Sequence, residues 1–227
     1  MTAAMTGPSW AALWPPSAVR VRSGDLELRY LDDELLLALA DLASRGLHDE
    51  DRMPFLHPWT RGTPAEVARS VLTYQWAQRA ALTPSRWSLE LAVLHQGRAV
   101  GVQAMTTTDF PVLGAAETGS WLGREHQGRG LGRQMRHLVL HLLFEGLGAR
   151  TATTSAREDN AASLGVTRAL GYRPDGTADA AVEGMPARIL RFRLDRADWD
   201  GRPPALRPPV TTEGLEALRA FLPGPTA

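Results

Sequence analysis

A glycine-rich turn between a strand-like segment and a helix-like segment most constrains how this chain can fold. The turn comprises Gln127, Gly128, Arg129, Gly130, Leu131 and Gly132. Residues 117–122 precede it, and 131–147 follow with apolar residues at helical spacing up to Gly148. A helix start presents free N–H groups and partial positive charge, and glycine lets an anion approach the backbone closely. The turn therefore predicts a phosphate-binding site made of main chain.

Two familiar phosphate-binding motifs do not fit this turn. The dinucleotide pattern G-x-G-x-x-G fails because Arg133 stands where the third glycine belongs. The Walker A loop needs a lysine, and all 25 basic residues of the chain are arginine. The pattern Q-x-x-G-x-G fits at every fixed position. A plain connecting turn remains the alternative.

The composition excludes several classes of chemistry. The chain has no cysteine, which excludes thiol nucleophiles, disulfides and cysteine-ligated metals. Its net charge is zero, so no overall field attracts nucleic acid or an anionic membrane. We find neither a signal-like N-terminus nor an apolar run of ~18 residues, and we expect a cytoplasmic protein. His137 and His141 lack the glutamate of an HExxH site, and we expect no metal.

The pattern along the chain predicts a single α/β domain with two appendages. An arm at 1–17 carries Trp10 and Trp14, the domain spans 18–198, and a proline-rich tail at 199–227 contains a short helix around 213–221. The expected helices are 34–44, after the capping residues Asp32 and Asp33, then 64–82, 131–147 and 160–170. The expected strands are 26–31, 87–94, 99–107, 117–122, 151–155, 172–182 and 187–194.

Residues 117–172, which read ETGSWLG…QGRGLG…EDNAASLGVTRALGY, resemble the coenzyme A-binding core of the GCN5-related N-acetyltransferases (GNAT). The resemblance is to the branch that includes the RimJ and RimL ribosomal-protein N-terminal acetyltransferases, and it extends to about residues 25–195. It implies a GNAT fold: a mostly antiparallel, seven-stranded mixed sheet, splayed at its strands 4 and 5 and flanked by about four helices.

The resemblance also implies the reaction. The enzyme takes an acyl-CoA, acetyl-CoA first of all, and acylates a primary amine directly. The amine belongs to a protein N-terminus, a lysine side chain or a small molecule. An actinobacterial-type subgroup that the chain also resembles includes users of succinyl-CoA, so a succinyltransferase is an alternative. A non-catalytic acyl-CoA-binding regulator and a purely structural partner-binding domain are alternatives of another class.

Acyl transfer to an amine needs a base, a polarised carbonyl and a proton for the departing thiolate. By resemblance, Glu117 is the base, acting through water, and Asp109 is its rival. Ser163 corresponds to the family serine near the thioester sulfur. Thr167 stands where many relatives have a tyrosine acid, which argues against a tyrosine-acid mechanism here.

The resemblance assigns the coenzyme to the turn residues 127–132 and to three further places. Asn160 hydrogen-bonds the coenzyme arm and also caps the helix that follows. Ser163 lies one turn later on that helix. The backbone of Trp121, Leu122 and Gly123 offers N–H groups to the acyl carbonyl, while the Trp121 ring is expected in the core.

For the acceptor, only position in the chain guides the choice of residues. The loop before the second helix, 48–63, carries Phe55, His57 and Trp59, and such loops commonly line sites. We therefore expect these three residues to contact the amine substrate. A homodimer formed through the tryptophan-bearing arm or the proline-rich tail is a further possibility that the sequence leaves open.

Overall fold

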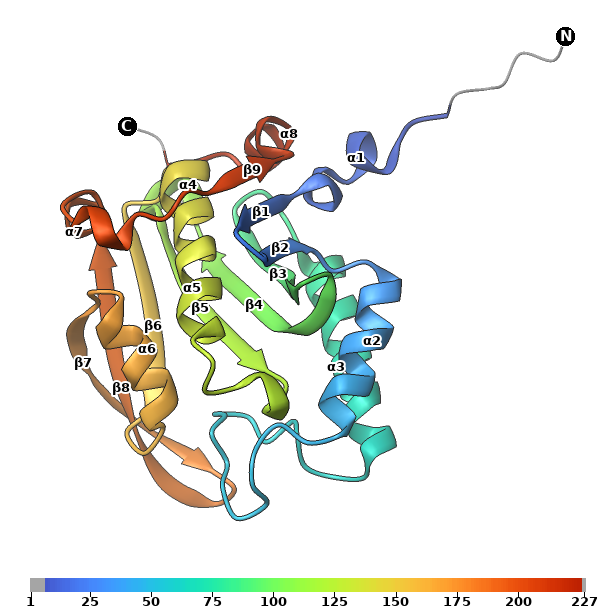
Figure 1. Ribbon diagram of the computed structural model, residues 1–227, viewed down its shortest axis with the longest axis vertical. Helices are drawn as coiled ribbons and strands as arrows, with labels where there is room; N and C mark the ends of the chain where they lie inside the picture. The colour runs from blue at the N-terminus through green and yellow to red at the C-terminus, as the bar shows by residue number, and fades with distance from the viewer. Residues whose placement is uncertain (1–6, 226–227) are drawn as a thin grey trace, which may run out of the picture.

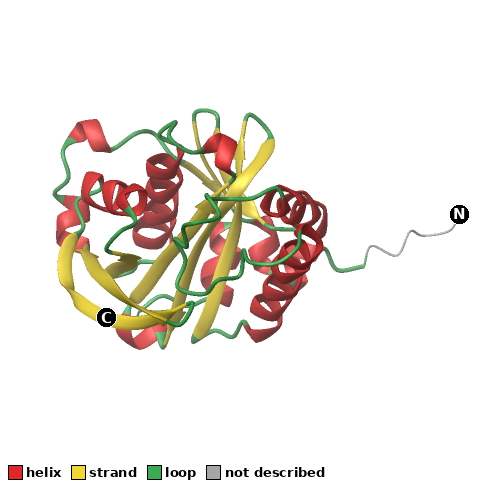
Figure 2. Ribbon diagram, turned by 90° about the horizontal axis from the view of Figure 1, so that it is seen from below, coloured by secondary structure: helices red, strands yellow, loops and turns green. Residues whose placement is uncertain are grey.

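The computed structural model describes residues 7–225, which form one mixed sheet with helices on both faces (Figures 1 and 2). The strand order is β7-β8-β6-β5-β4-β3-β2-β1-β9, and every pair is antiparallel except β5–β6. Within 7–225, no helix has the length and apolar character that crossing a bilayer requires. The expected α/β fold is confirmed.

The elements follow the expected order. The strands are β1 (Arg20–Ser23), β2 (Leu26–Tyr30), β3 (Arg86–His95), β4 (Arg98–Thr108), β5 (Ala115–Leu122), β6 (Thr151–Arg157), β7 (Arg173–Val182), β8 (Met185–Asp195) and β9 (Thr211–Glu213). The α-helices are α1 (Trp10–Leu13), α2 (Asp33–Ser44), α3 (Pro64–Ala81), α4 (Phe110–Leu113), α5 (Leu131–His141), α6 (Ala161–Ala169), α7 (Arg196–Asp200) and α8 (Leu215–Phe221). Shorter turns are η1 (Pro15–Ala18), η2 (Arg124–His126), η3 (Leu142–Gly146) and η4 (Pro204–Leu206).

The expected strand count of seven is wrong, because β1 and β9 extend the sheet beyond β2. Strand β1 has four residues and β9 has three, too few to show an alternating pattern in sequence. Their pairing joins distant parts of the chain, with Arg20 opposite Glu213. Arg22 donates hydrogen bonds to both Glu27 and Glu213, so charge pairs support this edge. The seven expected strands correspond to β2–β8.

Alternation along the central strands separates two faces of the sheet. On one face, Leu89 and Leu91 pack in the main core with helix α5. On the other face, Ala92 packs in the cluster formed with α2 and α3. Further along this second face the side chains become short or polar, at Ser88, Glu90, Ala104 and Thr106. The space under α3 is therefore not filled by the sheet.

The sheet divides between β5 and β6, as the family resemblance implies. These strands pair only from Ala115 with Thr151 to Glu117 with Thr153. Beyond Glu117, strand β5 stays with β4 and β6 stays with β8, so the two strands separate. Behind the gap, buried Arg136 of α5 donates to Thr154 Oγ1 (3.1 Å) and Ser120 Oγ (3.2 Å), which links the diverging strands.

The N-terminal arm and the C-terminal tail meet on the molecule. Residues 1–6 of the expected arm lie outside the described range, as do 226–227 of the tail. The Trp14 ring packs edge-on against Phe221 of α8, with 5.6 Å between ring centroids. Leu215 of α8 lies against Gly146, where a side chain would clash, and the helix expected through 147 has its last turn there in the wider π form, η3.

We expect Leu218→Ala to lower the free energy of unfolding by about 2–5 kcal/mol, because it leaves a cavity in the core. The Leu218 side chain is fully buried in the main hydrophobic cluster. Glu216→Ala on the exposed face of the same helix should change stability by less than ~0.5 kcal/mol. Urea unfolding followed by circular dichroism measures both, and equal effects would mean that α8 is only loosely attached.

Candidate functional site

The glycine-rich turn has the open main chain that its sequence predicts. Gly128 and Gly130 have φ angles of 72° and 79°, in the left-handed region that favours glycine. A Cβ on either residue would meet no atom within 4 Å, so the space in front of the backbone is free. Gly130 begins α5 without a side-chain cap, which leaves the first-turn amides to an external acceptor. Arg129 and Arg133 are exposed beside the turn.

Two side chains assigned to the coenzyme hold the neighbouring loop in place. Gln127 Nε2 donates to the carbonyls of Leu47 (2.8 Å) and Leu122 (2.9 Å). Asn160 Oδ1 accepts from the Ser163 amide (3.1 Å), which confirms the expected helix cap, and Asn160 Nδ2 donates to the Pro54 carbonyl (3.3 Å). Contact of these two side chains with coenzyme A remains a prediction.

The amides near the end of β5 are not equivalent. The Gly123 amide donates to the Val100 carbonyl (2.9 Å) and is already paired. Because N–H directions alternate along an antiparallel ladder, the Trp121 amide points to β4, while the amides of Ser120 and Leu122 point towards β6 and the gap. Of the backbone predicted at 121–123, only Leu122 keeps an amide on the open side. No sequence signal points to Ser120, since only strand pairing reveals the direction of its amide.

A cavity of about 530 Å³ lies on the α3 face of the sheet, within the usual range for ligand sites. Its floor is formed by β3, β4 and β5, its side by α3, and its roof by the loop between α2 and α3. The cavity brings together the predicted base Glu117 and all three predicted acceptor residues, Phe55, His57 and Trp59. The residues that line it are Phe55, Leu56, His57, Trp59, Ser70, Val71, Tyr74, Gln75, Glu90, Val102, Ala104, Thr106, Glu117, Thr118, Gly119, Ser120, Trp121 and Ser155.

Two other candidates lie outside the cavity lining. Ser163 is half-buried on α6, and its amide is used by the Asn160 cap. Asp109, the rival base, begins α4 with a left-handed backbone (φ 56°). Among the lining residues of 7–225, Glu117 is therefore the candidate base that the sequence named.

The roof of the cavity is an ordered loop with aromatic contacts. Phe55 and Trp59 have ring centroids 5.1 Å apart, and Trp59 lies 5.8 Å from the Trp121 ring. The Trp121 ring, expected in the core, is partly buried: it packs against the cluster of α2 and α3 and also lines the cavity, where Trp59 meets it. The hairpin of β7 and β8 reaches this loop (Figure 1), and Arg61 Nε donates to Glu183 Oε1 at 2.6 Å.

Glu117 stands where β5 and β6 begin to separate. Its Oε1 accepts a hydrogen bond from Ser155 Oγ at 2.7 Å, across the parallel pair. The side chain is exposed and lines the cavity, so water reaches it. A carboxylate at this point is placed to accept a proton from an amine in the gap, directly or through water.

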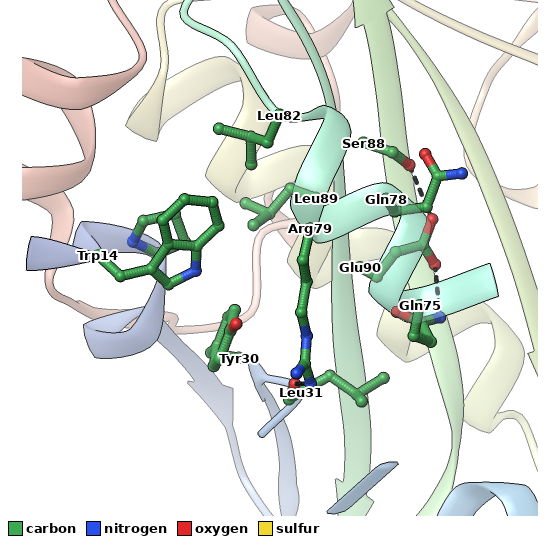
Figure 3. Close-up of a pocket in the computed structure, with 11 residues that line it drawn as sticks. Trp14, Tyr30, Leu31, Gln75, Gln78, Arg79, Leu82, Ser88, Leu89 and Glu90 are labelled. Carbon is green, nitrogen blue, oxygen red and sulfur yellow. Dashed lines mark hydrogen bonds between the residues drawn. The ribbon is translucent and has the colours of Figure 1, made fainter. Parts of the chain in front are cut away.

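Glu90, which the sequence analysis missed, is a buried carboxylate in the cavity wall. Its side chain accepts hydrogen bonds from Ser88 Oγ (2.7 Å), Tyr74 OH (3.2 Å) and Gln75 Nε2 (3.4 Å). Figure 3 shows it between strand β3 and helix α3. Burial raises the pKa of Glu90 above the ordinary glutamate value. The one signal in the sequence is a glutamate inside a mostly apolar segment, 87–93, in which Ser88 is the other polar residue.

The space on the other side of Glu90 gives this carboxylate no partner. It is lined by Trp14, Tyr30 and Arg79, and its volume of about 10 Å³ has room for a single water at most (Figure 3). Arg79 donates to Asp33 and to the Leu31 carbonyl. Within 7–225, no ion pair includes Glu90, so its charge is not compensated by the protein.

We expect Glu90→Gln to stabilise the protein by an amount that grows with pH. Because the pKa of Glu90 is raised in the folded state, its contribution to the free energy of unfolding is fully present below the unfolded pKa of about 4.3. This contribution is lost as pH rises through the folded-state pKa, where the buried carboxyl group becomes charged. Glutamine removes the charge, so the gain at pH 8 should be on the order of 1–3 kcal/mol. Thermal melts between pH 5 and 8 measure it, with exposed Glu216→Gln as control. A gain independent of pH would contradict the expectation.

The sequence profile of the acetyltransferase (GNAT) domain family matches residues 25–173, more than half of the chain. This range includes the turn, the gap between β5 and β6, and the cavity.

Three solved structures share the fold. RimJ of Mycobacterium smegmatis in complex with CoA-disulfide is 20% identical, with 91% of this chain and 95% of that one covered and a TM-score of 0.65. The ribosomal-protein-S5-alanine acetyltransferase from Vibrio fischeri is 18% identical, with 81% of this chain and 99% of that one covered and a TM-score of 0.62. RimL, a ribosomal L7/L12 alpha-N-protein acetyltransferase in complex with coenzyme A, is 22% identical, covers 78% and 97%, and has a TM-score of 0.60. At these identities the likeness establishes the fold alone.

Proposed function

Because this chain belongs to the GNAT acetyltransferase family, we propose that it transfers the acetyl group of acetyl-CoA to a primary amine in one direct step. The observation that carries this proposal is the alignment of three features along one gap. Exposed amides of the turn at Gly128–Gly132 lie at one end, the inward amide of Ser120 in the middle, and the carboxylate of Glu117 where β5 and β6 meet.

In this reaction the protein acts on protons and charge. The amides of the turn bind the pyrophosphate of acetyl-CoA, and the amide of Ser120 donates to the thioester oxygen as negative charge develops there. The neutral amine attacks the carbonyl carbon, the C–N bond forms and the C–S bond breaks. Glu117 accepts the amine proton through water, and Ser163 is the proposed proton donor to the thiolate. No acyl-enzyme is required, in keeping with a chain without cysteine.

The lining of the cavity favours acetyl over succinyl transfer. A succinyl group carries a carboxylate, which calls for an arginine or other donors near its end. The described residues that line the cavity include two glutamates, Glu90 and Glu117, and no arginine. Like charges repel in such a site, whereas a cationic amine is attracted.

For the acceptor, we propose an N-terminal α-amine as the first to test. The structures with this fold include one named as a ribosomal L7/L12 alpha-N-protein acetyltransferase. An α-amine has a pKa of about 8, so a substantial fraction of it is already neutral near neutral pH. It therefore depends less on a base than a lysine-like amine does.

Calorimetry with acetyl-CoA, succinyl-CoA and free coenzyme A tests the first half of the proposal, and thiol release in the presence of a panel of amines tests the second. We expect binding of all three ligands, and amine-dependent thiol release from acetyl-CoA above that from succinyl-CoA. Binding without release across the panel would instead favour a non-catalytic regulator. Absence of binding would refute both.

A further inference from the structure

The buried carboxylate of Glu90 has no part in the reaction proposed above. We propose that Glu90, together with Tyr74, binds a second cationic group of the acceptor, an ammonium or guanidinium about 10 Å from the amine that is acylated. This inference rests on the proposed function, because it takes the cavity to be the acceptor site. It deepens that function by specifying the charge pattern of the substrate.

Strand register gives the distance. Glu90 pairs with Ala104, and Ala104 pairs with Gly119, so Glu90 lies in one row with the residue before Ser120. Two strand spacings separate the ends of this row, which amounts to roughly 10 Å. Glu90 is therefore too far from the gap to take the proton of the attacking amine, which needs hydrogen-bond reach. A group at the far end of the same acceptor is within its reach.

The hydrogen bonds of Glu90 leave room for a ligand. A carboxylate offers about four acceptor sites, and Glu90 receives three donors, of which that from Gln75 is long at 3.4 Å. All three donors are neutral. A buried charge without a counter-ion is costly, and a cation that enters from the cavity removes this cost while it satisfies the remaining acceptor site.

The rest of the lining fits an acceptor with charged ends and an apolar middle. The cavity that holds both glutamates is also lined by Val71, Val102 and Ala104, which suit an alkyl segment. The Tyr74 ring also lines the cavity and donates its hydroxyl to Glu90, so its aromatic face adds attraction for a cation. An acceptor with one amine and an apolar tail satisfies only half of this lining.

The test compares two matched pairs of acceptors. The small-molecule pair is hexamethylenediamine and hexylamine, and the peptide pair is alanyl-arginine amide and alanyl-norleucine amide. We expect the wild-type enzyme to prefer, in at least one pair, the member with the second cationic group. Glu90→Gln should reduce that preference in kcat/KM by about 10- to 100-fold, mainly through KM. The pair that responds identifies the source as a small amine or a peptide. The exposed control Glu216→Gln should keep the wild-type preference.

A wild-type enzyme without preference in either pair, or a Glu90→Gln variant that keeps the preference, overturns the inference. Calorimetry of the same acceptors, with the protein saturated with coenzyme A, separates it from the proposed function. Glu90-dependent binding of the member with the second cationic group, without any turnover, would refute the proposed acetyl transfer and support the cation subsite. Turnover of hexylamine with no dependence on Glu90 for the diamine would do the reverse.

Discussion

Gly130→Glu should weaken the binding of coenzyme A on the order of 100-fold or more. The Gly130 amide begins helix α5, and the new carboxylate would occupy the place of a phosphate oxygen and repel its charge. A Cβ at Gly130 would have no atom within 4 Å, so the substitution causes no steric clash, and its cost inside the protein is the backbone strain of the positive φ. Calorimetry with coenzyme A, and KM for acetyl-CoA, measure the loss.

Gly148→Glu is a matched control for this prediction. Gly148 has a φ angle of 73°, close to the 79° of Gly130, and it too has free space around a Cβ. Both substitutions therefore impose similar backbone strain and add the same charge, but Gly148 follows η3 at the far end of the helical segment that Gly130 begins. If the two variants bind coenzyme A equally well, the turn is not the phosphate site.

Glu117→Gln should lower kcat by about 10²- to 10⁴-fold, the usual contribution of a positioned base. Glutamine keeps an oxygen that accepts the hydrogen bond from Ser155, so the local packing is preserved while the proton acceptor is lost. The binding of coenzyme A should not change, because the turn at Gly128–Gly132 is untouched. Steady-state kinetics and calorimetry on the same preparation measure both quantities.

The defect of Glu117→Gln should depend on the acceptor and on pH. At a pH above the pKa of the amine, the neutral nucleophile is abundant. The loss of kcat should therefore be smaller for an α-amine, with a pKa of about 8, than for an alkylamine with a pKa of about 10.4. Asp109→Asn serves as the comparison, since Asp109 lies outside the cavity lining. A full loss in Asp109→Asn together with an active Glu117→Gln would assign the base to Asp109.

The family resemblance and the local patterns predicted most of the fold, because they depend on neighbours in the chain. The hairpin of β3 and β4 turns at Gln96 and Gly97 as expected, both with positive φ. Helix α2 begins after Asp32, whose Oδ1 accepts from the Leu35 amide at 2.9 Å. Thr63 and Glu66 form a capping box at the start of α3, and Pro64 occupies the first position of the helix.

The candidate site was predictable in part. The loop residues Phe55, His57 and Trp59 were named on position alone, and they meet Glu117 in one cavity. Ser120 and Glu90 were missed, because each acquires its place through strand pairing. The register with β4 turns the Ser120 amide towards the gap between β5 and β6, and the burial of Glu90 depends on helix α3 lying over it.

The sequence by itself determined where the chain turns and where an anion is predicted to bind, since glycine at positive φ and a helix start act over a few residues. Only the tertiary structure decided that β9 completes the sheet, that the side chains of Gln127 and Asn160 anchor the roof loop, and that the cavity contains an uncompensated carboxylate. The cavity arises where the register of β3, β4 and β5 brings short side chains together beneath α3. This arrangement joins residues far apart in the chain, and no local pattern encodes it.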